Sequence, residues 1–401
     1  MSGIVVIGAG QAGLSLCATL RAEGETGPVT LIGAEPWPPY QRPPLSKAYL
    51  LGEMARERLF LRPEGWYGDH GIELRLGAPA EAIDLAARTV TVAGEAITYD
   101  RLALTTGLAA RTLPAETGGD LDGAHTVRTL ADIDALAPAL RAAGRVVVVG
   151  GGYIGLEAAS VARKLGAKVT VIEAGERILG RVASAETAAV MRRIHRDRGV
   201  EIREGTALAR LLGEAHVVGA ELEGGEEIAA DLAIVGIGLD PRVRLAEAAG
   251  LETADGVAVD ELGRTSDARV WAAGDCASFP WRGGRIRLES VQNAIDMGEA
   301  VARNMMGAEA PYLPVPWFWS DQYEVKMQIA GLSAGHDRVV TRGELPAVSH
   351  WYYRGEDFLA VDSIGDAKAY MVGKRLLEAG GSPDPAAVAD PDTNLRTLLP
   401  R

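Results

Sequence analysis

The chain has 401 residues, more than one hydrophobic core usually holds, so the sequence predicts two or three domains. Its formal net charge of -13 argues against a nucleic-acid-binding protein, which would need a basic surface. The two cysteines, Cys17 and Cys276, stand in no metal-binding spacing, so we expect no metal site, no disulfide framework and no iron–sulfur cluster within the chain.

The chain opens on a strand, a glycine-rich turn and a helix. β-Branched residues fill positions 4–7, and the turn at 8–13 has the sequence Gly-Ala-Gly-Gln-Ala-Gly. A helix and a second strand at 29–32 follow, which completes a βαβ unit. The first strand leaves no room for a signal peptide, and no apolar run reaches the ~20 residues that span a bilayer. We therefore expect a cytoplasmic protein that does not enter a membrane.

The same pattern returns in the middle of the chain. Residues 85–99 alternate like a β-hairpin, and residues 102–106 are predicted to form a buried strand. At 145–155 a run of valines leads into the turn Gly-Gly-Gly-Tyr-Ile-Gly, and another strand follows a helix at 169–172. Two separate βαβ units predict two parallel-sheet domains.

The last part of the chain has a different composition. Buried strands are expected at 229–237 and 270–273, and prolines at 311–316 then mark a linker. Residues 318–372 combine Trp and Tyr with an alternating pattern, which predicts a third, smaller α+β domain. Residues 379–400 are rich in Gly, Pro, Asp and Ala, so we expect an extended arm that lies on the surface or is partly disordered.

Each glycine-rich turn has the context of a dinucleotide-binding site. The glycines allow a tight turn that leaves the helix N-terminus free for a pyrophosphate. Glu35 and Glu173 follow the second strands of the two units, where a carboxylate would accept hydrogen bonds from ribose hydroxyls. The alternative is that both turns are only structural, and the repeated context argues against it. Glu173 favours NADH, while Arg177 nearby leaves NADPH as an alternative.

The segment at 39–47, Pro-Tyr-Gln-Arg-Pro-Pro-Leu-Ser-Lys, resembles the signature of the FAD-containing ferredoxin reductases that serve cytochrome P450 and aromatic-ring dioxygenase systems. Segments 104–107 and 270–275 resemble those of two-dinucleotide flavoproteins in general. Four more segments, at 150–157, 236–238, 288–294 and 316–323, are similar to the ferredoxin reductase family, so the resemblance covers almost the whole chain. It implies an α/β fold of the glutathione-reductase type with two Rossmann-like domains. The implied domains are a discontinuous FAD domain (1–108 and 236–311), an NAD domain (109–235) and a C-terminal α+β domain (312–401).

The resemblance also implies the residues of both cofactor sites. The implied FAD contacts are Gly8, Gly10, Ala12, Gly13, Ala34, Glu35, Arg42, Lys47, Ala80, Thr106, Gly107, Arg111, Arg128, Gly274, Asp275 and Val291. The implied NADH contacts are Gly150, Gly152, Tyr153, Ile154, Gly155, Glu173 and Gly238. The family often has an aspartate where Ala34 stands, so Glu35 or the backbone would have to hold the ribose. For Asp275 the alternative role is a helix N-cap before Ala277.

Three residues are expected to be catalytic. The resemblance places Lys47 near N5 of the flavin and pairs it with Glu157, because a buried lysine needs a carboxylate partner. The alternative for Lys47 is a solvated side chain after a proline turn. Trp319, or less favoured Trp317, is expected at the flavin edge, where core packing is a compatible alternative.

The expected activity is electron transfer from NADH through FAD to a [2Fe–2S] ferredoxin that supplies a P450 or a dioxygenase. Residues 42–47 hold no cysteine, which excludes the disulfide reductases and NADH peroxidases of this fold. We expect a monomer that docks the ferredoxin transiently by electrostatic attraction, with Lys326 as first contact candidate. The basic run at 192–198 is interpreted as a solvated helix face. The alternatives are a rubredoxin reductase, a diaphorase-type donor, or an interaction protein that resembles apoptosis-inducing factor.

Overall fold

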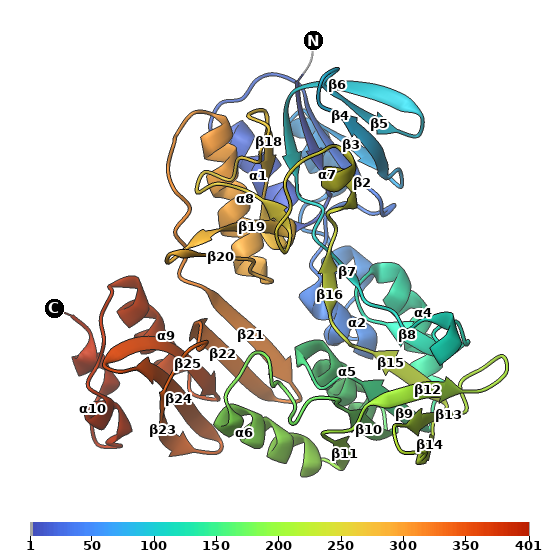
Figure 1. Cartoon of the computed structure of the whole chain (residues 1–401), viewed down its shortest axis with the longest axis vertical. Coiled ribbons are helices and arrows are strands. Elements are labelled where there is room, and N and C mark those ends of the chain that lie inside the picture. The colour runs from blue at the N-terminus through green and yellow to red at the C-terminus, as the bar shows by residue number, and fades with distance from the viewer. Residues whose placement is uncertain (1–2, 401) are drawn as a thin grey trace. The chain divides into compact units, whose positions relative to one another are not determined.

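The computed structural model describes residues 3–400, and its sheets and helices form two compact units (Figure 1). Unit 1 comprises Met1–Gln41, Arg56–Ala109 and Leu239–Pro314. Unit 2 comprises the remaining segments, Arg42–Ala55, Ala110–Gly238 and Val315–Arg401. Residues 1, 2 and 401, which belong to the predicted domains 1–108 and 312–401, lie outside the described residues. The division into three domains stays a prediction.

Unit 1 is built on a mixed sheet whose central strands are largely buried. The parallel strands are β1 (Gly3–Ile7), β2 (Val29–Gly33), β3 (Ile72–Leu76), β6 (Glu95–Leu104) and β18 (Val270–Ala272). Strands β4 (Ala80–Asp84) and β5 (Thr89–Val92) extend the sheet in antiparallel pairing from β6, which confirms the predicted hairpin. Helices α1 (Gln11–Ala22) and α8 (Val291–Met305) pack against each other.

The smaller elements of unit 1 connect this core. They are η2 (Arg56–Arg58), α3 (Glu64–Asp69), β7 (Leu108–Ala110), β16 (Leu239–Pro241), α7 (Arg244–Ala248), β17 (Val257–Ala258), η4 (Gly274–Cys276), β19 (Ala277–Trp281) and β20 (Gly284–Ile286). The helix α1 begins directly after the first glycine turn, as the sequence predicts. It buries Leu14, Leu16 and Leu20 against the sheet side of the unit.

Unit 2 contains a second, fully parallel sheet with the order β11-β10-β9-β15-β8. Its strands are β8 (Ala124–Thr126), β9 (Arg145–Val149), β10 (Lys168–Ile172), β11 (Val200–Arg203) and β15 (Leu232–Val235). Its helices are α4 (Leu130–Ala142), α5 (Tyr153–Lys164) and α6 (Ala185–Arg196). A small antiparallel sheet of β12 (Leu208–Leu212), β13 (Gly219–Leu222) and β14 (Glu227–Ala229) is inserted before β15. The second predicted βαβ unit is thereby confirmed.

The segment that carries the proline-rich signature also belongs to unit 2. It forms the 3₁₀ turn η1 (Pro43–Ser46) and the short helix α2 (Ala48–Leu51), and η1 contacts α5 and α4. A further 3₁₀ turn, η3 (Ala115–Thr117), contacts β12. Residues 42–55 therefore belong to unit 2, although the residues directly before and after them belong to unit 1.

The C-terminal part of unit 2 is an antiparallel sheet covered by a helix (Figure 1). Its strands are β21 (Trp317–Gln322), β22 (Val325–Gly331), β23 (Arg338–Glu344), β24 (Ala347–Arg354) and β25 (Asp357–Ile364), in the order β21-β22-β25-β24-β23. Helix α9 (Ala367–Glu378) packs on β25 and β22. This arrangement confirms the α+β character predicted for the region.

The prediction of an extended surface arm at 379–400 is wrong. The segment folds into α10 (Pro385–Ala389) and the 3₁₀ turn η5 (Leu395–Leu398). Val388 and Leu395 are buried in the hydrophobic core with Trp351, and Arg342 binds four backbone carbonyls of the segment. A few well-spaced apolar side chains thus anchor a segment whose overall composition is polar. Among the described helices, none is long and apolar enough to cross a lipid bilayer.

Candidate functional site

The first glycine turn leaves open space at the N-terminus of α1. Gly8 has a φ of +122°, and a Cβ there would lie 2.1 Å from the backbone oxygen of Thr105, so only glycine fits. Gly10 is the N-cap of α1, and a Cβ on it would meet nothing within 4 Å. The turn is therefore tight on its inner side and open on its outer side. That shape fits a pyrophosphate bound to the helix N-terminus, where N–H groups and the helix dipole favour an anion.

Glu35 is held at the end of β2 by a tyrosine that sequence reasoning overlooked. The hydroxyl of Tyr40, a buried residue of the proline-rich signature, donates a hydrogen bond of 2.5 Å to Oε2 of Glu35. Ala34 beside it is exposed and has no side-chain acceptor. Glu35 is thus the side chain of this strand end that can accept hydrogen bonds from a ribose. The signal was present in the sequence as Tyr40, five residues after the acid.

The other predicted FAD contacts of unit 1 gather around this turn. Gly13 also packs on Gly8, and Gly274 packs on Ala12, since a Cβ on Gly274 would lie 2.8 Å from the Ala12 Cβ. Asp275 lies in η4 directly after β18. Ala277 begins strand β19, so the alternative role of Asp275 as a helix N-cap is wrong.

Other predicted positions lie at element ends. Val291 is the first residue of α8, Ala80 is the first residue of β4, and Thr106 and Gly107 follow β6, where Thr106 Oγ1 donates to the Arg242 carbonyl. In unit 2, Arg42 donates a hydrogen bond of 2.7 Å to the Arg128 carbonyl, which brings these two predicted positions together. The amide of Arg111 donates to the Gly238 carbonyl at 3.0 Å. Their contacts with FAD stay predictions.

The second glycine turn repeats the geometry of the first. Gly150 has a φ of +105°, and a Cβ there would lie 2.3 Å from the Gly236 carbonyl oxygen. Gly152, the N-cap of α5, again faces open space, while Gly155 packs on Gly150. The Tyr153 hydroxyl is buried and has no hydrogen-bond partner within the described part of the chain, and its burial raises the pKa of Tyr153. An open helix N-terminus beside an unpaired buried hydroxyl fits a bound nucleotide.

The carboxylate of Glu173 is fixed in front of this turn. Its Oε2 accepts a hydrogen bond from the Gly151 amide and its Oε1 accepts one from the Gly175 amide, both at 2.7 Å. Each oxygen keeps acceptor capacity for a ribose hydroxyl. Arg177, which could have neutralised a 2′-phosphate, donates instead to the carbonyls of residues 180, 183 and 184. The local geometry thus favours a free ribose diol.

Lys47 and Glu157 form the predicted ion pair. Nζ of Lys47 lies 2.7 Å from Oε2 of Glu157, which is almost completely buried in α5. Two hydroxyls complete the site, because Ser46 donates to Oε2 at 2.5 Å and Ser320 donates to Oε1 at 2.6 Å. The carboxylate therefore has three donors, two from the proline-rich segment and one from β21, which offsets the cost of burying its charge. The alternative of a freely solvated Lys47 is wrong.

Strand β21 presents different chemistry on its two faces. Trp317 and Trp319 lie on one face with their ring centroids 5.7 Å apart. Phe318 and Ser320 lie on the other face, where Phe318 packs 4.8 Å from the Tyr153 ring and Ser320 reaches Glu157. The period-two alternation of a strand produces this division. The predicted role of Trp319 at the flavin stays a prediction.

The interpretation of residues 192–198 as a solvated helix face is wrong for part of the run. Arg193 and Arg196 are exposed, but His195 is completely buried and its Nε2 lies 2.7 Å from Oε1 of Gln322. Arg198 packs over the Tyr323 ring. The signal was the helical spacing of the buried positions 188, 191, 194 and 195, which the many charges obscured.

Burial of His195 predicts a specific acid sensitivity. Desolvation lowers the pKa of His195 from 6.5 to about 4. Between these values the unfolded chain binds a proton that the folded chain does not, so stability falls as the pH is lowered from 6.5 to 4, by about 3 kcal/mol in all. Urea unfolding at pH 7 and pH 4.5 should show a smaller acid loss in His195→Gln than in the parent protein. An equal loss of unfolding free energy in both proteins would contradict the prediction. Burial also raises the pKa of Asp362 to about 6, but this group is present in both proteins and does not affect the comparison.

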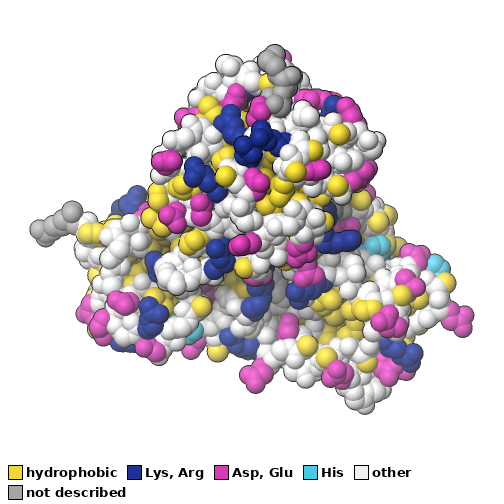
Figure 2. Space-filling model, turned by 45° about the horizontal axis from the view of Figure 1, so that its top comes forward, with side chains coloured by type: hydrophobic (Ala, Val, Ile, Leu, Met, Phe, Trp, Pro, Cys, Tyr) yellow, Lys and Arg dark blue, Asp and Glu magenta, His cyan; other side chains and the backbone are white. Residues whose placement is uncertain are grey.

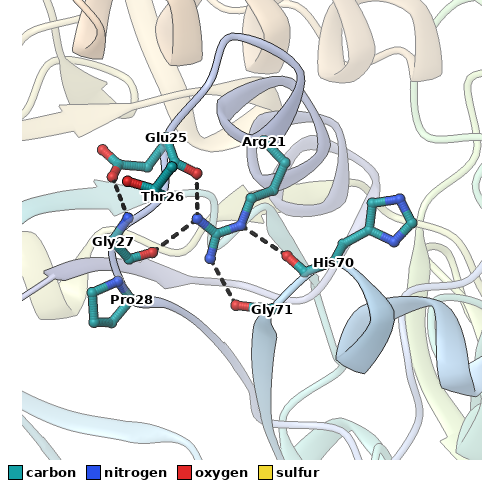
Figure 3. Close-up of a pocket in the computed structure, with 7 residues that line it drawn as sticks. All are labelled: Arg21, Glu25, Thr26, Gly27, Pro28, His70 and Gly71. Atoms are coloured by element: carbon teal, nitrogen blue, oxygen red, sulfur yellow. Dashed lines mark hydrogen bonds between the residues drawn. The ribbon is translucent and has the colours of Figure 1, made fainter.

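A separate pocket in unit 1 is structural (Figure 3). Arg21 at the end of α1 points into it, and its guanidinium donates to the backbone carbonyls of Glu25, Gly27, His70 and Gly71. These carbonyls occupy the donors of the arginine and tie α1 to the segment before β3. The arginine therefore has a structural role in this pocket, since four of its five N–H groups are used within the chain.

Comparison with known proteins decides the family. Residues 2–298 match the family model described as pyridine nucleotide-disulphide oxidoreductase, and residues 317–399 match the reductase C-terminal domain. The chain belongs to the pyridine nucleotide-disulphide oxidoreductases. As a member, this reductase is an enzyme that uses FAD and a nicotinamide nucleotide.

Individual relatives narrow the comparison. A ferredoxin–NAD(P)(+) reductase from Sphingomonas sp is 43% identical over 99% of this chain and 97% of its own length. The structure of the ferredoxin reductase for the CYP199A2 system from Rhodopseudomonas palustris matches with a TM-score of 0.97 and 36% identity, covering 100% of both chains. The reductase in the covalent putidaredoxin reductase–putidaredoxin complex matches with a TM-score of 0.95 and 36% identity, covering 99% of this chain and 98% of the other. A rubredoxin–NAD(+) reductase from Ectopseudomonas oleovorans is 38% identical over 90% of this chain and 95% of its own length.

The thiols distinguish this reductase from the disulphide-reducing members of its family. Cys17 lies in α1 and Cys276 in η4, both are free, and neither side chain is exposed. Burial raises the pKa of Cys17 to about 12 and also raises that of Cys276, so both stay thiols at neutral pH. Cys17 is packed as a small apolar residue, as the sequence predicts.

Proposed function

We propose that this reductase transfers electrons from NADH through FAD to a [2Fe–2S] ferredoxin that supplies a cytochrome P450 or a ring-hydroxylating dioxygenase. One observation carries the proposal: two dinucleotide-binding turns occur in a chain whose two thiols are both buried and protonated. Electrons must then leave the flavin directly for an external acceptor. Similar proteins named as ferredoxin reductases of oxygenase systems support the same acceptor class.

FAD, when bound, accepts a hydride and releases electrons one at a time. The turn at Gly10 would hold its pyrophosphate, and the Glu35 carboxylate, fixed by Tyr40, would bind its adenosine ribose. The Lys47 ammonium, fixed by Glu157, would supply a positive charge at the reacting end and thereby favour the reduced cofactor. Trp319 would exclude water from the route by which electrons leave.

The second turn would position NADH. Gly152 leaves room for the pyrophosphate, and Glu173 would accept hydrogen bonds from the ribose diol. A 2′-phosphate would face that carboxylate, while the guanidinium of Arg177 is directed to backbone carbonyls of residues 180, 183 and 184. This arrangement supports NADH as the natural donor.

The acceptor would dock transiently and by charge. Acidic and basic side chains are interspersed on the face seen in Figure 2, so the net charge of -13 does not exclude a local basic patch. Lys326 on β22 is exposed and remains our first contact candidate. Arg287 is a weaker candidate for such a contact, because its side chain is almost buried and pairs with Asp255 and Glu289. We propose further that the reductase is a monomer and works in the cytoplasm.

The test is anaerobic reduction of a [2Fe–2S] ferredoxin by the purified protein with NADH or NADPH. Because like charges placed together cost several kcal/mol, kcat/KM should favour NADH by about 100-fold or more. Glu173→Ala, which removes the carboxylate, should lower the ratio of kcat/KM with NADH to kcat/KM with NADPH at least about tenfold. Equal rates with both nucleotides in the parent protein would refute the role of Glu173. Flavin bleaching by NADH with reduction of rubredoxin but no ferredoxin would refute the acceptor and favour the rubredoxin alternative.

A further inference from the structure

A continuous chain of buried polar groups runs from Lys47 through unit 2. Beyond the ion pair with Glu157, the chain passes through Ser320 and Gln322 on β21 to His195 on α6. Ser320, Gln322 and His195 have no exposed surface at all. Polar groups buried this deeply are costly unless every one is paired, so the geometry of each member depends on the next.

The hydrogen bonds of this chain all run in one direction. The Gln322 amide nitrogen donates to Ser320 Oγ at 3.1 Å, so the Ser320 hydroxyl keeps its proton for Glu157 Oε1. The Gln322 amide oxygen can only accept, and it lies 2.7 Å from Nε2 of His195. Nε2 must therefore carry the imidazole proton. A rotated Gln322 amide would place two acceptor oxygens face to face at Ser320 and two N–H donors face to face at His195.

The far end of the chain fixes the histidine in this state. The Tyr323 hydroxyl lies 3.3 Å from Nδ1 of His195 and can donate to it when the ring is neutral. Tyr323 has a φ of +57°, a strained conformation for an aromatic residue, and Arg198 packs over its ring at 4.6 Å. The contacts of the ring with Arg198 and His195 stabilise the tyrosine in that conformation. Lys164 also binds its backbone carbonyl at 3.4 Å.

We propose that Gln322 and His195 are positioning residues for Lys47. By holding the Ser320 hydroxyl on Oε1 of Glu157, they leave Oε2 to Ser46 and Lys47 and so fix where the ammonium lies. The inference rests on the proposed function of Lys47 at the flavin. The network does not conduct protons, because the Gln322 amide neither gains nor loses one. Its role is to keep a charge in place.

The test is an anaerobic redox titration of the bound FAD with a chemical reductant, without NADH or ferredoxin. Gln322→Met and His195→Phe keep the side-chain volume but remove the hydrogen bonds. Each should lower the preference for reduced FAD about tenfold, which is about 30 mV for a two-electron couple. His195→Gln restores a donor at the Nε2 position and should return the equilibrium to within about threefold of the parent value.

Thr187→Val is the matched control. Thr187 lies on the same helix, is equally buried and donates a hydrogen bond of 2.8 Å to Asp362, but it does not touch the network. Thr187→Val should lower the free energy of unfolding without changing the equilibrium between oxidised and reduced FAD. A shift in Thr187→Val as large as that in Gln322→Met would overturn the proposal, since a general loosening of α6 would then explain both.

Lys47→Met separates this inference from the proposed function. If Lys47→Met shifts the flavin equilibrium and the Gln322 and His195 variants do not, the positioning role is wrong while the function of Lys47 stands. If Lys47→Met causes no shift, both are wrong. Nitrogen-15 NMR of the parent protein needs no variant to fold: a neutral Nε2–H tautomer of His195 at pH 7 supports the network, and an Nδ1–H tautomer refutes it.

Discussion

Replacing Gly152 by alanine is expected to weaken NADH binding about 100-fold while FAD stays bound. A Cβ at this N-cap would meet no protein atom within 4 Å, so unit 2 should fold normally. The added methyl group would occupy the open space in front of α5, where the pyrophosphate must approach the backbone. Overpacking of this kind costs up to about 3 kcal/mol, and each 1.4 kcal/mol is about tenfold in affinity. Titration of the oxidised enzyme with NAD⁺ by calorimetry measures the change.

The matched control is Gly68→Ala in α3, another glycine with open space around its Cβ position. It should leave the binding of both cofactors unchanged. The reciprocal variant, Gly10→Ala, should release FAD and leave the binding of NAD⁺ to unit 2 intact. If Gly152→Ala bound NAD⁺ as tightly as the parent protein, the second turn would not be the nucleotide site.

Replacing Glu157 by leucine is expected to lower the free energy of unfolding by about 3–5 kcal/mol, the usual cost of breaking a buried ion pair from one side. The change leaves the Lys47 ammonium and the hydroxyls of Ser46 and Ser320 without their common acceptor. Glu157→Gln keeps an acceptor oxygen and should cost less. Urea unfolding followed by circular dichroism measures both effects.

The double variant Lys47→Met, Glu157→Leu provides the internal check. Because the double variant also removes the Lys47 ammonium, it should be more stable than Glu157→Leu alone. The effects of the two substitutions on the free energy of unfolding should therefore not be additive. The exposed pair of Glu201 and Arg203 in the same unit gives the surface control. Glu201→Leu should cost at most ~1 kcal/mol. If Glu157→Leu lowered the free energy of unfolding by only ~1 kcal/mol, as at the surface, the Glu157 carboxylate would be effectively solvated.

The local features of this fold were predictable from the sequence. Each strand, glycine turn and helix start of the two βαβ units depends on residues within about ten positions of one another, and the structure places them where expected. Gly8 and Gly150 are examples, because the run of β-branched residues directly before each glycine marks it as the start of the turn. The contacts that require glycine there, with Thr105 and Gly236, come from distant segments of the chain.

Long-range polar partners were not predictable in the same way. Ser46 and Ser320 meet on Glu157 across 111 and 163 residues of sequence, and serines give no pattern that marks such a contact. His195 stands among four arginines and looked solvated, although its helical position faces inward. Pairings of this kind depend on how separate sheets pack, which periodicity alone does not encode.

The course of the chain through residues 42–55 limits how this reductase can be dissected. The contiguous stretch 110–238 contains the second parallel sheet and Glu157, but it lacks Ser46 and Lys47, which arrive from the segment between Gln41 and Arg56. A fragment cut at the apparent sheet boundaries would carry a buried carboxylate stripped of its partners. Chimeras that exchange this part between relatives must therefore transplant three pieces of chain together: the sheet, the proline-rich segment and β21, which supplies Ser320.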